Sequence, residues 1–153
     1  MARLLTDPRA PRMAGSRQFE LNGWIDTAPF EDLLGMTIES SGAGAAVLSM
    51  PFEVRHAQGG GVLHGGALTA LADTAVAVAI KTLLAEGTTF ATTHLATDFL
   101  APVRQGRVRA QARVRGPEDR SFFGTAELLD EDDRVVARFS CEFRVARGQG
   151  LGP

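Results

Sequence analysis

The sequence has a single cysteine among 153 residues and only one long apolar run. One cysteine cannot form an internal disulfide, so nothing in the chain points to an oxidising compartment. The apolar run covers residues 65–80 and carries Asp73 at its middle among several small residues, so we expect no membrane span. The first twenty residues lack the apolar stretch of a secretory signal. We therefore expect a cytoplasmic protein.

Basic residues are fewer than acidic ones. The formal net charge is −2, so there is no global attraction for a polyanion and nucleic acid is not an expected partner. With 44% hydrophobic and 22% charged residues, the composition is typical of a soluble globular protein with a sizeable core. We expect an N-terminal arm over 1–22, mobile or loosely docked, one domain over 23–146 and a C-terminal tail over 147–153.

Hydrophobic periodicity predicts one long helix and five to six strands, mostly in an antiparallel meander, and hence the α+β class. A short helix is expected to start at Thr27 and Pro29 and to stop at Gly35. The long helix follows a glycine-rich loop and is expected over 65–84, before Gly87. The predicted strands cover 37–39, 45–52, 89–100, 107–115, 121–129 and 134–145.

One carboxylate stands alone in the long helix. Between His64 and Lys81 every residue except Asp73 is uncharged, and small or apolar residues occupy all sides of the helix. Burial disfavours the charged form of an isolated carboxylate, so we expect a raised pKa and a candidate base or nucleophile at Asp73. The alternative is that Asp73 faces solvent or a subunit interface.

Glycines dominate the loop before this helix and the first helical positions. The run from Gly59 to Gly66, broken only at residues 62–64, leaves free backbone N–H groups and no Cβ atoms at the helix start. Such a start can bind or polarise an oxyanion. The alternative is that the glycines only make a tight turn. No Gly-Lys-Ser/Thr follows, which excludes a phosphate-binding loop.

The spacing of Gly65 and Asp73 carries a prediction about assembly. They are eight residues apart on one helix, so their backbones lie about 12 Å apart. Two groups at that distance cannot both contact one carbonyl carbon. If both act on the same substrate, the Gly65 N–H of one subunit must meet Asp73 of another across a two-fold axis. A catalytic role therefore predicts a homodimer with two composite sites.

Four segments together resemble the hotdog-fold acyl-CoA thioesterases of the PaaI-like (phenylacetic-acid-pathway) type: residues 61–66 (GVLHGG), 71–75 (LADTA), 92–95 (TTHL) and 98–102 (DFLAP). The resemblance covers about residues 30–145. It implies a hotdog fold, a long central helix wrapped by a curved antiparallel sheet, with dimers formed through sheet edges and paired into a tetramer. The implied activity is hydrolysis of a medium-chain or aryl acyl-CoA to a free acid and coenzyme A, without cofactor or metal.

The resemblance also implies catalytic roles. The N–H of Gly65 would polarise the thioester carbonyl, and Asp73 would activate water or attack directly. Gln58, where relatives often have asparagine, and Thr92 would orient the water or Asp73. His64 would shape the helix start or lie beside the thioester sulfur. Five further residues are expected to bind substrate: Gly66, Thr93, His94, Arg104 and Arg120.

An apolar tunnel between subunits is expected to hold the acyl group. Its candidate wall residues are Phe30, Leu33, Leu34, Met36, Val76 and Phe99. The arginines at alternate positions of 107–115 are expected to form a solvated strand face.

The remaining reactive side chains are expected to be structural. His56 and His94 lack metal-ligand spacing, and Cys141 sits in an alternating strand as a small hydrophobic residue. No Gly-x-Ser-x-Gly motif is present, which excludes the α/β-hydrolase route to ester cleavage. Two other functions stay open: a hotdog hydratase or dehydratase that pairs Asp73 with His64 or His94, and a non-catalytic acyl-CoA-binding protein.

Overall fold

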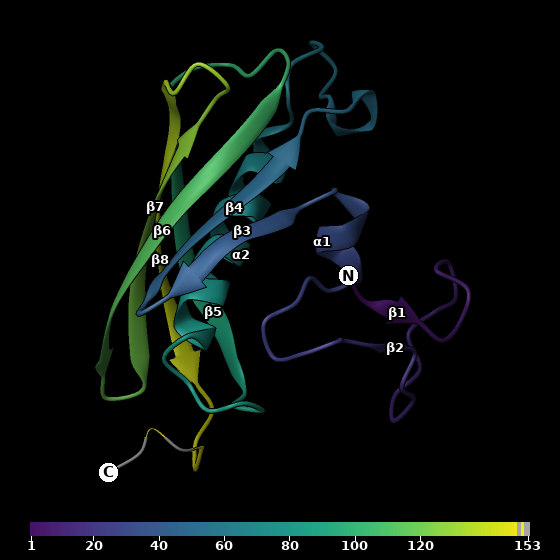
Figure 1. Ribbon diagram of the computed structural model, residues 1–153, viewed down its shortest axis with the longest axis vertical. Coiled ribbons are helices and arrows are strands. Elements are labelled where there is room, and N and C mark those ends of the chain that lie inside the picture. Colours follow the sequence, from purple (N-terminus) through teal and green to yellow (C-terminus); the bar gives the residue numbers. More distant parts are fainter. Residues whose placement is uncertain (150, 152–153) are drawn as a thin grey trace.

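A computed structural model describes residues 1–149 and Leu151, and its main body is one long helix packed against one curved sheet (Figure 1). The helix, α2, spans Gly65–Lys81. The sheet has six antiparallel strands in the order β3-β4-β6-β7-β8-β5. Their bounds are Thr37–Gly42 (β3), Ala45–Pro51 (β4), Phe90–Phe99 (β5), Arg107–Glu118 (β6), Ser121–Leu129 (β7) and Val135–Val145 (β8). The predicted hotdog fold is confirmed.

Alternation along each strand decides which side chains face α2. Along β8 the odd-numbered residues from Ala137 to Val145 are buried, whereas Arg138, Ser140 and Arg144 between them are exposed. The same period buries the apolar residues of β6 and places its arginines on the outer face, so the predicted solvated row is observed. The inner face of the sheet and one side of α2 form a single core.

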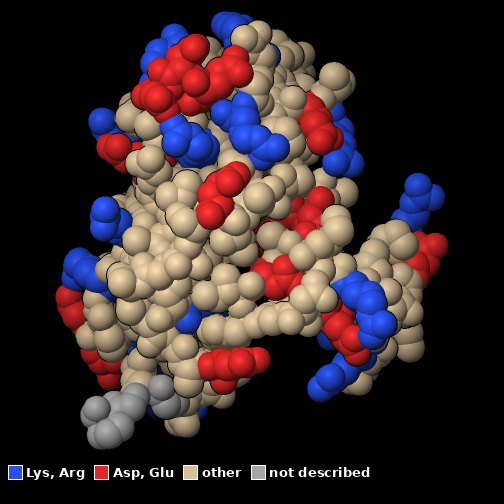
Figure 2. Space-filling model, in the orientation of Figure 1, with Lys and Arg blue, Asp and Glu red and all other residues tan. Residues whose placement is uncertain are grey.

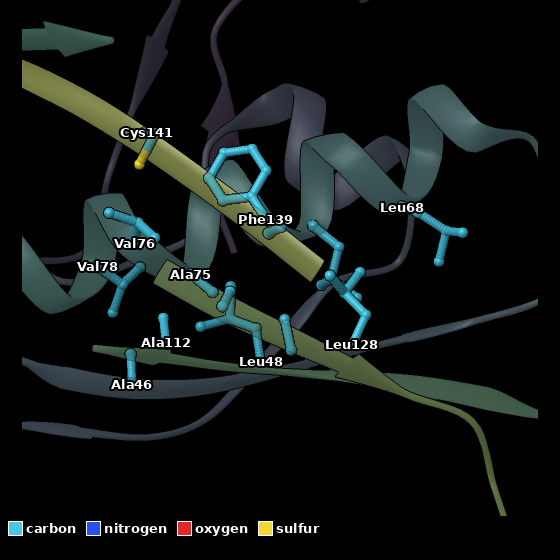
Figure 3. Close-up of a cluster of buried hydrophobic side chains, with 14 of the residues drawn as sticks. Ala46, Leu48, Leu68, Ala75, Val76, Val78, Ala112, Leu128, Phe139 and Cys141 are labelled. Atoms are coloured by element: carbon cyan, nitrogen blue, oxygen red, sulfur yellow. The ribbon is translucent and has the colours of Figure 1, made fainter. Parts of the chain in front are cut away.

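Small residues let α2 approach the sheet closely. Ala72, Ala75 and Val76 are fully buried against the inner face, and Figure 3 shows Ala75 and Val76 beside side chains of β8 such as Cys141. A Cβ added to Gly124 of β7 would lie 2.3 Å from Val76 Cγ1, which is inside van der Waals contact. The glycine is therefore required where the helix crosses β7.

Three element boundaries differ from the prediction. The helix ends at Lys81 instead of residue 84, because the Thr82 hydroxyl turns back to the carbonyl of Ala79. Strand β3 continues to Gly42 because the β3–β4 hairpin turns through only two residues, both with positive φ. The short helix, α1 (Pro29–Leu33), is capped at Ala28, whose N–H binds the Glu31 carboxylate, and not at Thr27.

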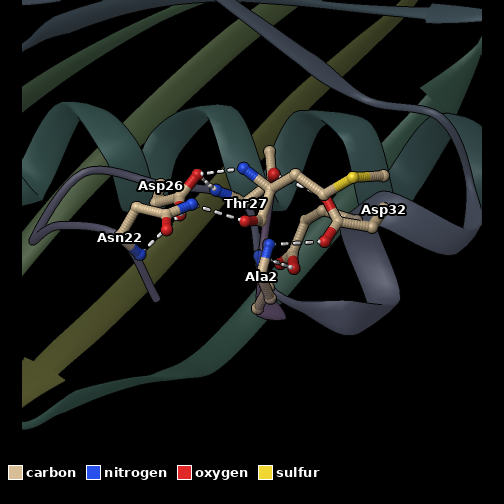
Figure 4. A network of polar contacts seen from close by, with 8 residues as sticks. Ala2, Asn22, Asp26, Thr27 and Asp32 are labelled. Carbon is tan, nitrogen blue, oxygen red and sulfur yellow. Dashed lines mark hydrogen bonds and ion pairs between the residues drawn. The ribbon is translucent and has the colours of Figure 1, made fainter. Parts of the chain in front are cut away.

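The N-terminal arm is more ordered than its sequence predicts. It contains a two-stranded sheet of β1 (Arg3–Leu4) and β2 (Phe19–Glu20). No hydrophobic run in the sequence predicts these strands. Figure 4 shows the polar contact that connects the arm to α1, in which the Ala2 N–H binds Asp32. The Met1 amine binds Asp26, in the segment before α1. The division at residue 22 stays a prediction, and the predicted tail 147–153 lies partly outside the described residues.

A short 3₁₀ helix, η1 (Val54–His56), precedes the glycine-rich loop. Within the part of the chain that the structure describes, no helix is long and apolar enough to cross a membrane.

Packing at the crossing of α2 and β7 gives a first prediction. Gly124→Ala should lower the free energy of unfolding by about 1 to 3 kcal/mol, because the new methyl group overlaps Val76. Urea unfolding followed by circular dichroism measures this. Gly59→Ala is the control, since a Cβ there meets no atom within 4 Å. Equal midpoints for the two variants would contradict the packing described here.

Candidate active site

Asp73 lies halfway along α2, half-buried, and faces strand β5. The hydroxyl of Thr92 donates to its carboxylate, with Oγ1 3.0 Å from Oδ1 and 3.2 Å from Oδ2. Burial raises the pKa of Asp73, and the negative charge of Glu31 raises it further, whereas the Thr92 hydrogen bond opposes both effects. The predicted direction of the pKa shift is therefore found, and Thr92 is the group that holds the carboxylate.

The start of α2 has its own geometry. His64 is the N-cap residue, and its Nδ1 accepts a hydrogen bond of 2.8 Å from the N–H of Gly66. The N–H of Gly65 has no acceptor among the described residues. Because the helix dipole also favours negative charge at this end, the Gly65 amide is available to a developing oxyanion. His64 thus shapes the helix start, one of the two roles considered for it.

The loop before α2 brings Gln58 to this helix start. The loop is closed by two short backbone hydrogen bonds, from His64 N–H to the His56 carbonyl and from Gln58 N–H to the Val62 carbonyl, both 2.9 Å. The Gln58 side-chain carbonyl accepts from the Gly60 N–H. A cleft of about 350 Å³ joins these elements; its lining includes Gln58, Gly65, Leu68, Phe99 and residues 100–103. Gln58 and Gly65 therefore share one cleft.

A second cleft, of about 380 Å³, opens on another face of the same helix start. Phe30 of α1 and Leu34, the residue that follows α1, line it with His56, His64, Gly66 and Ala67. The His56 ring is buried, with Nδ1 2.9 Å from the Pro51 carbonyl, and its Nε2 has no partner among the described residues. The sequence predicted a structural role for His56, which lacks metal-ligand spacing, but gave no sign that its Nε2 is buried without a partner.

The expected tunnel walls are divided between clefts and core. Phe30 and Leu34 line the second cleft and Phe99 lines the first. Met36 and Val76 are buried in the core instead, so they are not wall residues in this protomer, and Leu33 is exposed.

A bulge in β5 separates Thr92 from the two residues after it. The pairing of β5 with β8 shifts between Thr92 and His94, so His94 lies opposite Glu142 on the outer face of the sheet. The Thr93 hydroxyl donates to the Glu142 carbonyl at 3.2 Å. Within one protomer, Thr93 and His94 therefore do not join Asp73.

The two expected phosphate-binding arginines lie at opposite ends of strand β6. Arg104 is exposed in the loop before β6, next to Val103 of the first cleft. Arg120 lies in the turn after β6, where its guanidinium donates to the Val145 carbonyl at 2.7 Å. A single protomer does not bring them together.

The single thiol is inert. Burial, with a smaller contribution from the charge of Asp73, raises the pKa of Cys141 to about 12. The thiolate needed for a nucleophile is therefore absent at neutral pH. Among the described residues, no three His, Cys, Asp or Glu side chains lie in a group that could hold a metal ion.

The side of α2 around Asp73 is less covered than the side that faces the sheet. Thr69, Asp73, Thr74 and Ala77 are only half-buried there, whereas residues on the opposite side are fully buried. Strand β5, next to this side, is an edge of the sheet and pairs only with β8. The half-buried face of α2 and the unpaired edge of β5 are thus adjacent.

The raised pKa of Asp73 predicts a pH-dependent effect on stability. The folded state holds this proton more tightly than the unfolded state, so ionisation of Asp73 destabilises the fold above the folded-state pKa, and the penalty vanishes as pH falls through it. Asp73→Asn should therefore raise the urea midpoint at about pH 8, and the gain should shrink towards about pH 4. Glu86→Gln, at an exposed position, is the control. A gain that is independent of pH would contradict this account.

Comparisons with known proteins agree with this geometry. A model of the thioesterase superfamily matches residues 60–137, more than half of the chain. A Haemophilus influenzae protein named as a presumed esterase is 39% identical over 79 residues, which cover 52% of this chain and 57% of that protein, less than two thirds of its length.

Solved structures are similar over a longer range. The PaaI protein of the Escherichia coli phenylacetic acid degradation operon has a TM-score of 0.71 and 28% identity, covering 80% of this chain and 87% of that one. A variant of the phenylacetic acid degradation protein PaaI from Thermus thermophilus has a TM-score of 0.70 and 30% identity, covering 76% and 98%. The chain therefore belongs to the thioesterase superfamily, as a PaaI-like member with the hotdog fold.

Proposed function

We propose that this thioesterase cleaves medium-chain or aryl acyl-CoA to a free acid and coenzyme A, in a homodimer with composite active sites. The observation that carries the proposal is the pair formed by Asp73 and Thr92 on the half-open side of α2. A carboxylate with a raised pKa, held by a single hydroxyl on an otherwise uncharged helix face, suits a base or nucleophile better than a structural ion.

The dimer follows from the distance between the two helix groups. Gly65 and Asp73 lie eight residues apart on α2, about 12 Å, so one protomer cannot apply both to one carbonyl. If two β5 edges pair antiparallel across a two-fold axis, the two α2 helices also run antiparallel, with the Gly65 N–H of one level with Asp73 of the other. Each dimer then contains two sites, and pairing of dimers gives the expected tetramer.

The reaction uses these groups in sequence. The Gly65 N–H donates a hydrogen bond to the thioester oxygen and stabilises the negative charge that develops there. In one route Asp73 removes a proton from water as the water attacks the carbonyl carbon. In the other route the Asp73 carboxylate attacks the carbonyl carbon and forms an anhydride, which water then hydrolyses. In both routes the carbon–sulfur bond breaks and coenzyme A leaves as the thiol. Gln58 lies in the Gly65 cleft, where its amide can orient the water.

Two apolar clefts meet at the helix start and supply room for an acyl group. The cleft with Phe30 and Leu34 has only His56, His64 and Arg55 as polar side chains, and the cleft with Phe99 has only Gln58. Such walls favour an apolar or aromatic acyl group over a charged one.

A panel of acyl-CoAs tests the proposal. Release of free thiol from short-chain, medium-chain, long-chain and aryl acyl-CoA should show turnover by the wild type, highest for the medium-chain or aryl members. Asp73→Asn should reduce kcat by about 100-fold or more while the protein stays folded. Nearly full activity in the variant would remove Asp73 from the mechanism. Hydration of an enoyl-CoA without thiol release would identify a hydratase instead.

The Thr92 hydroxyl should control the pH profile. Activity requires ionised Asp73, so it should fall as pH drops through the pKa of this carboxyl. Thr92→Val removes the hydrogen bond that lowers this pKa, and the acid limb of kcat should move to higher pH. Thr92→Ser keeps the hydroxyl and should restore the wild-type limb. Identical profiles for the valine and serine variants would show that the hydroxyl does not act on Asp73.

A further inference from the structure

The N-terminal arm has satisfied its polar groups but not buried its apolar ones. Gln18, in this arm, is buried and bonded at both ends of its amide: its side-chain carbonyl accepts from Arg12 and from the Met13 N–H, and its NH₂ group donates to the Pro11 carbonyl. In contrast, the large apolar side chains of the arm are between 38% and 74% exposed; these are Met1, Leu4, Leu5, Met13, Phe19 and Leu21. Such a surface indicates a partner.

The arm projects from the main body. Figure 1 shows β1, β2 and their loops to one side of the sheet, and Figure 2 shows them as a lobe beside the body. The chain that follows the arm is fixed at Trp24, whose indole N–H donates to the Lys81 carbonyl at 3.0 Å and whose ring packs edge-on against Phe90. Phe90 is the first residue of β5. The arm therefore starts near the beginning of the open sheet edge.

The proposed dimer determines what lies opposite this point, and the inference rests on that dimer. When two β5 edges pair antiparallel, the beginning of one strand lies level with the end of the other. At that end, Phe99 and Leu100 are 56% and 50% exposed and line the cleft that contains Gly65. An arm that joins the main body beside Phe90 thus lies near the mouth of the partner subunit's cleft.

Charge favours the same contact. The arm has four arginines against Asp7 and Glu20, whereas the rest of the chain has twelve basic and sixteen acidic residues. Arg9 and Arg17 form no ion pair within the described residues. The acidic turn 130–133 lies in the region of the end of β5, since Leu100 N–H binds the Val136 carbonyl that follows this turn. Within the chain, Arg134 pairs with Asp130 and Asp132 and Arg109 pairs with Asp133, so the four carboxylates and two arginines leave a net charge of −2 for a basic arm to meet.

We infer that the N-terminal arm clasps a second copy of this chain and covers the mouth of the partner's Gly65 cleft with its apolar side chains. The Thermus thermophilus PaaI structure is matched over 98% of its own length but covers only 76% of this chain, so this chain has residues beyond the shared fold. The clasp would extend the interface beyond the β5 edges, and residues of both subunits would then form the mouth of each cleft.

Cross-linking between two variants that each carry one added cysteine tests the clasp. Leu5→Cys and Leu100→Cys proteins are mixed, allowed to exchange subunits and treated with a short bismaleimide. Native Cys141 is buried with its pKa raised to about 12, so it does not react. We expect a covalent dimer in the mixture and none with either variant alone. Leu5→Cys mixed with Leu83→Cys is the matched control, because Leu83 is exposed but follows the other end of α2.

A second measurement does not depend on one pair of positions. Leu5→Ser combined with Met13→Ser should speed subunit exchange, measured by native mass spectrometry, by about tenfold. Leu83→Ser should leave it unchanged. Absence of the specific cross-link together with unchanged exchange, or a protein that stays monomeric, would overturn the clasp. Neither readout uses turnover, so a cross-linked protein that cleaves no acyl-CoA would overturn the proposed activity alone.

Discussion

The close contact between α2 and the inner face of the sheet determines the position of every group in the candidate site. Val76 fills the space that a side chain at Gly124 would need, and fully buried alanines continue this contact along the helix. A helix packed at this density cannot rotate or slide without overlap. Asp73 is therefore fixed toward β5, and Gly65 is fixed at the helix end beside Phe99.

The site keeps a carboxylate where the fold would be more stable without it. Burial and the charge of Glu31 both disfavour ionised Asp73, and one Thr92 hydroxyl compensates only in part. At the helix start, the His64 ring accepts the hydrogen bond of the Gly66 N–H, whereas the Gly65 N–H has no partner among the described residues. Both features are typical of sites where stability is given up for reactivity.

The sequence predicted the elements whose evidence is local. Alternation identified the strands, and the uncharged run after the glycine-rich loop identified the helix, with Gly65 at its start and Asp73 at its middle, because each pattern lies within one element. Glu31 was missed as a neighbour of Asp73, since α1 brings it there from 42 positions away.

Other expected site residues lie apart from Asp73 within one protomer, for a geometric reason. Thr93 and His94 were expected at the site, but the bulge after Thr92 shifts the residues that follow relative to β8. No residue type in this segment predicts the bulge. Arg104 and Arg120 lie before and after the predicted strand 107–115, so the sequence already placed them at opposite ends of one strand, and their binding of substrate stays a prediction. The sheet of the arm was missed because two-residue strands carry no periodicity.

The position of Trp24 has a practical consequence for any unfolding study. It is the only tryptophan, and the chain has no tyrosine, so intrinsic fluorescence comes almost entirely from one ring. That ring packs on Lys81 and Phe90, at the junction of the arm with the end of α2 and the beginning of β5, and not in the core between helix and sheet. A fluorescence melting curve will therefore follow the release of this junction, whereas circular dichroism will follow the sheet. Coincidence of the two curves would mean that arm and body unfold as one cooperative unit.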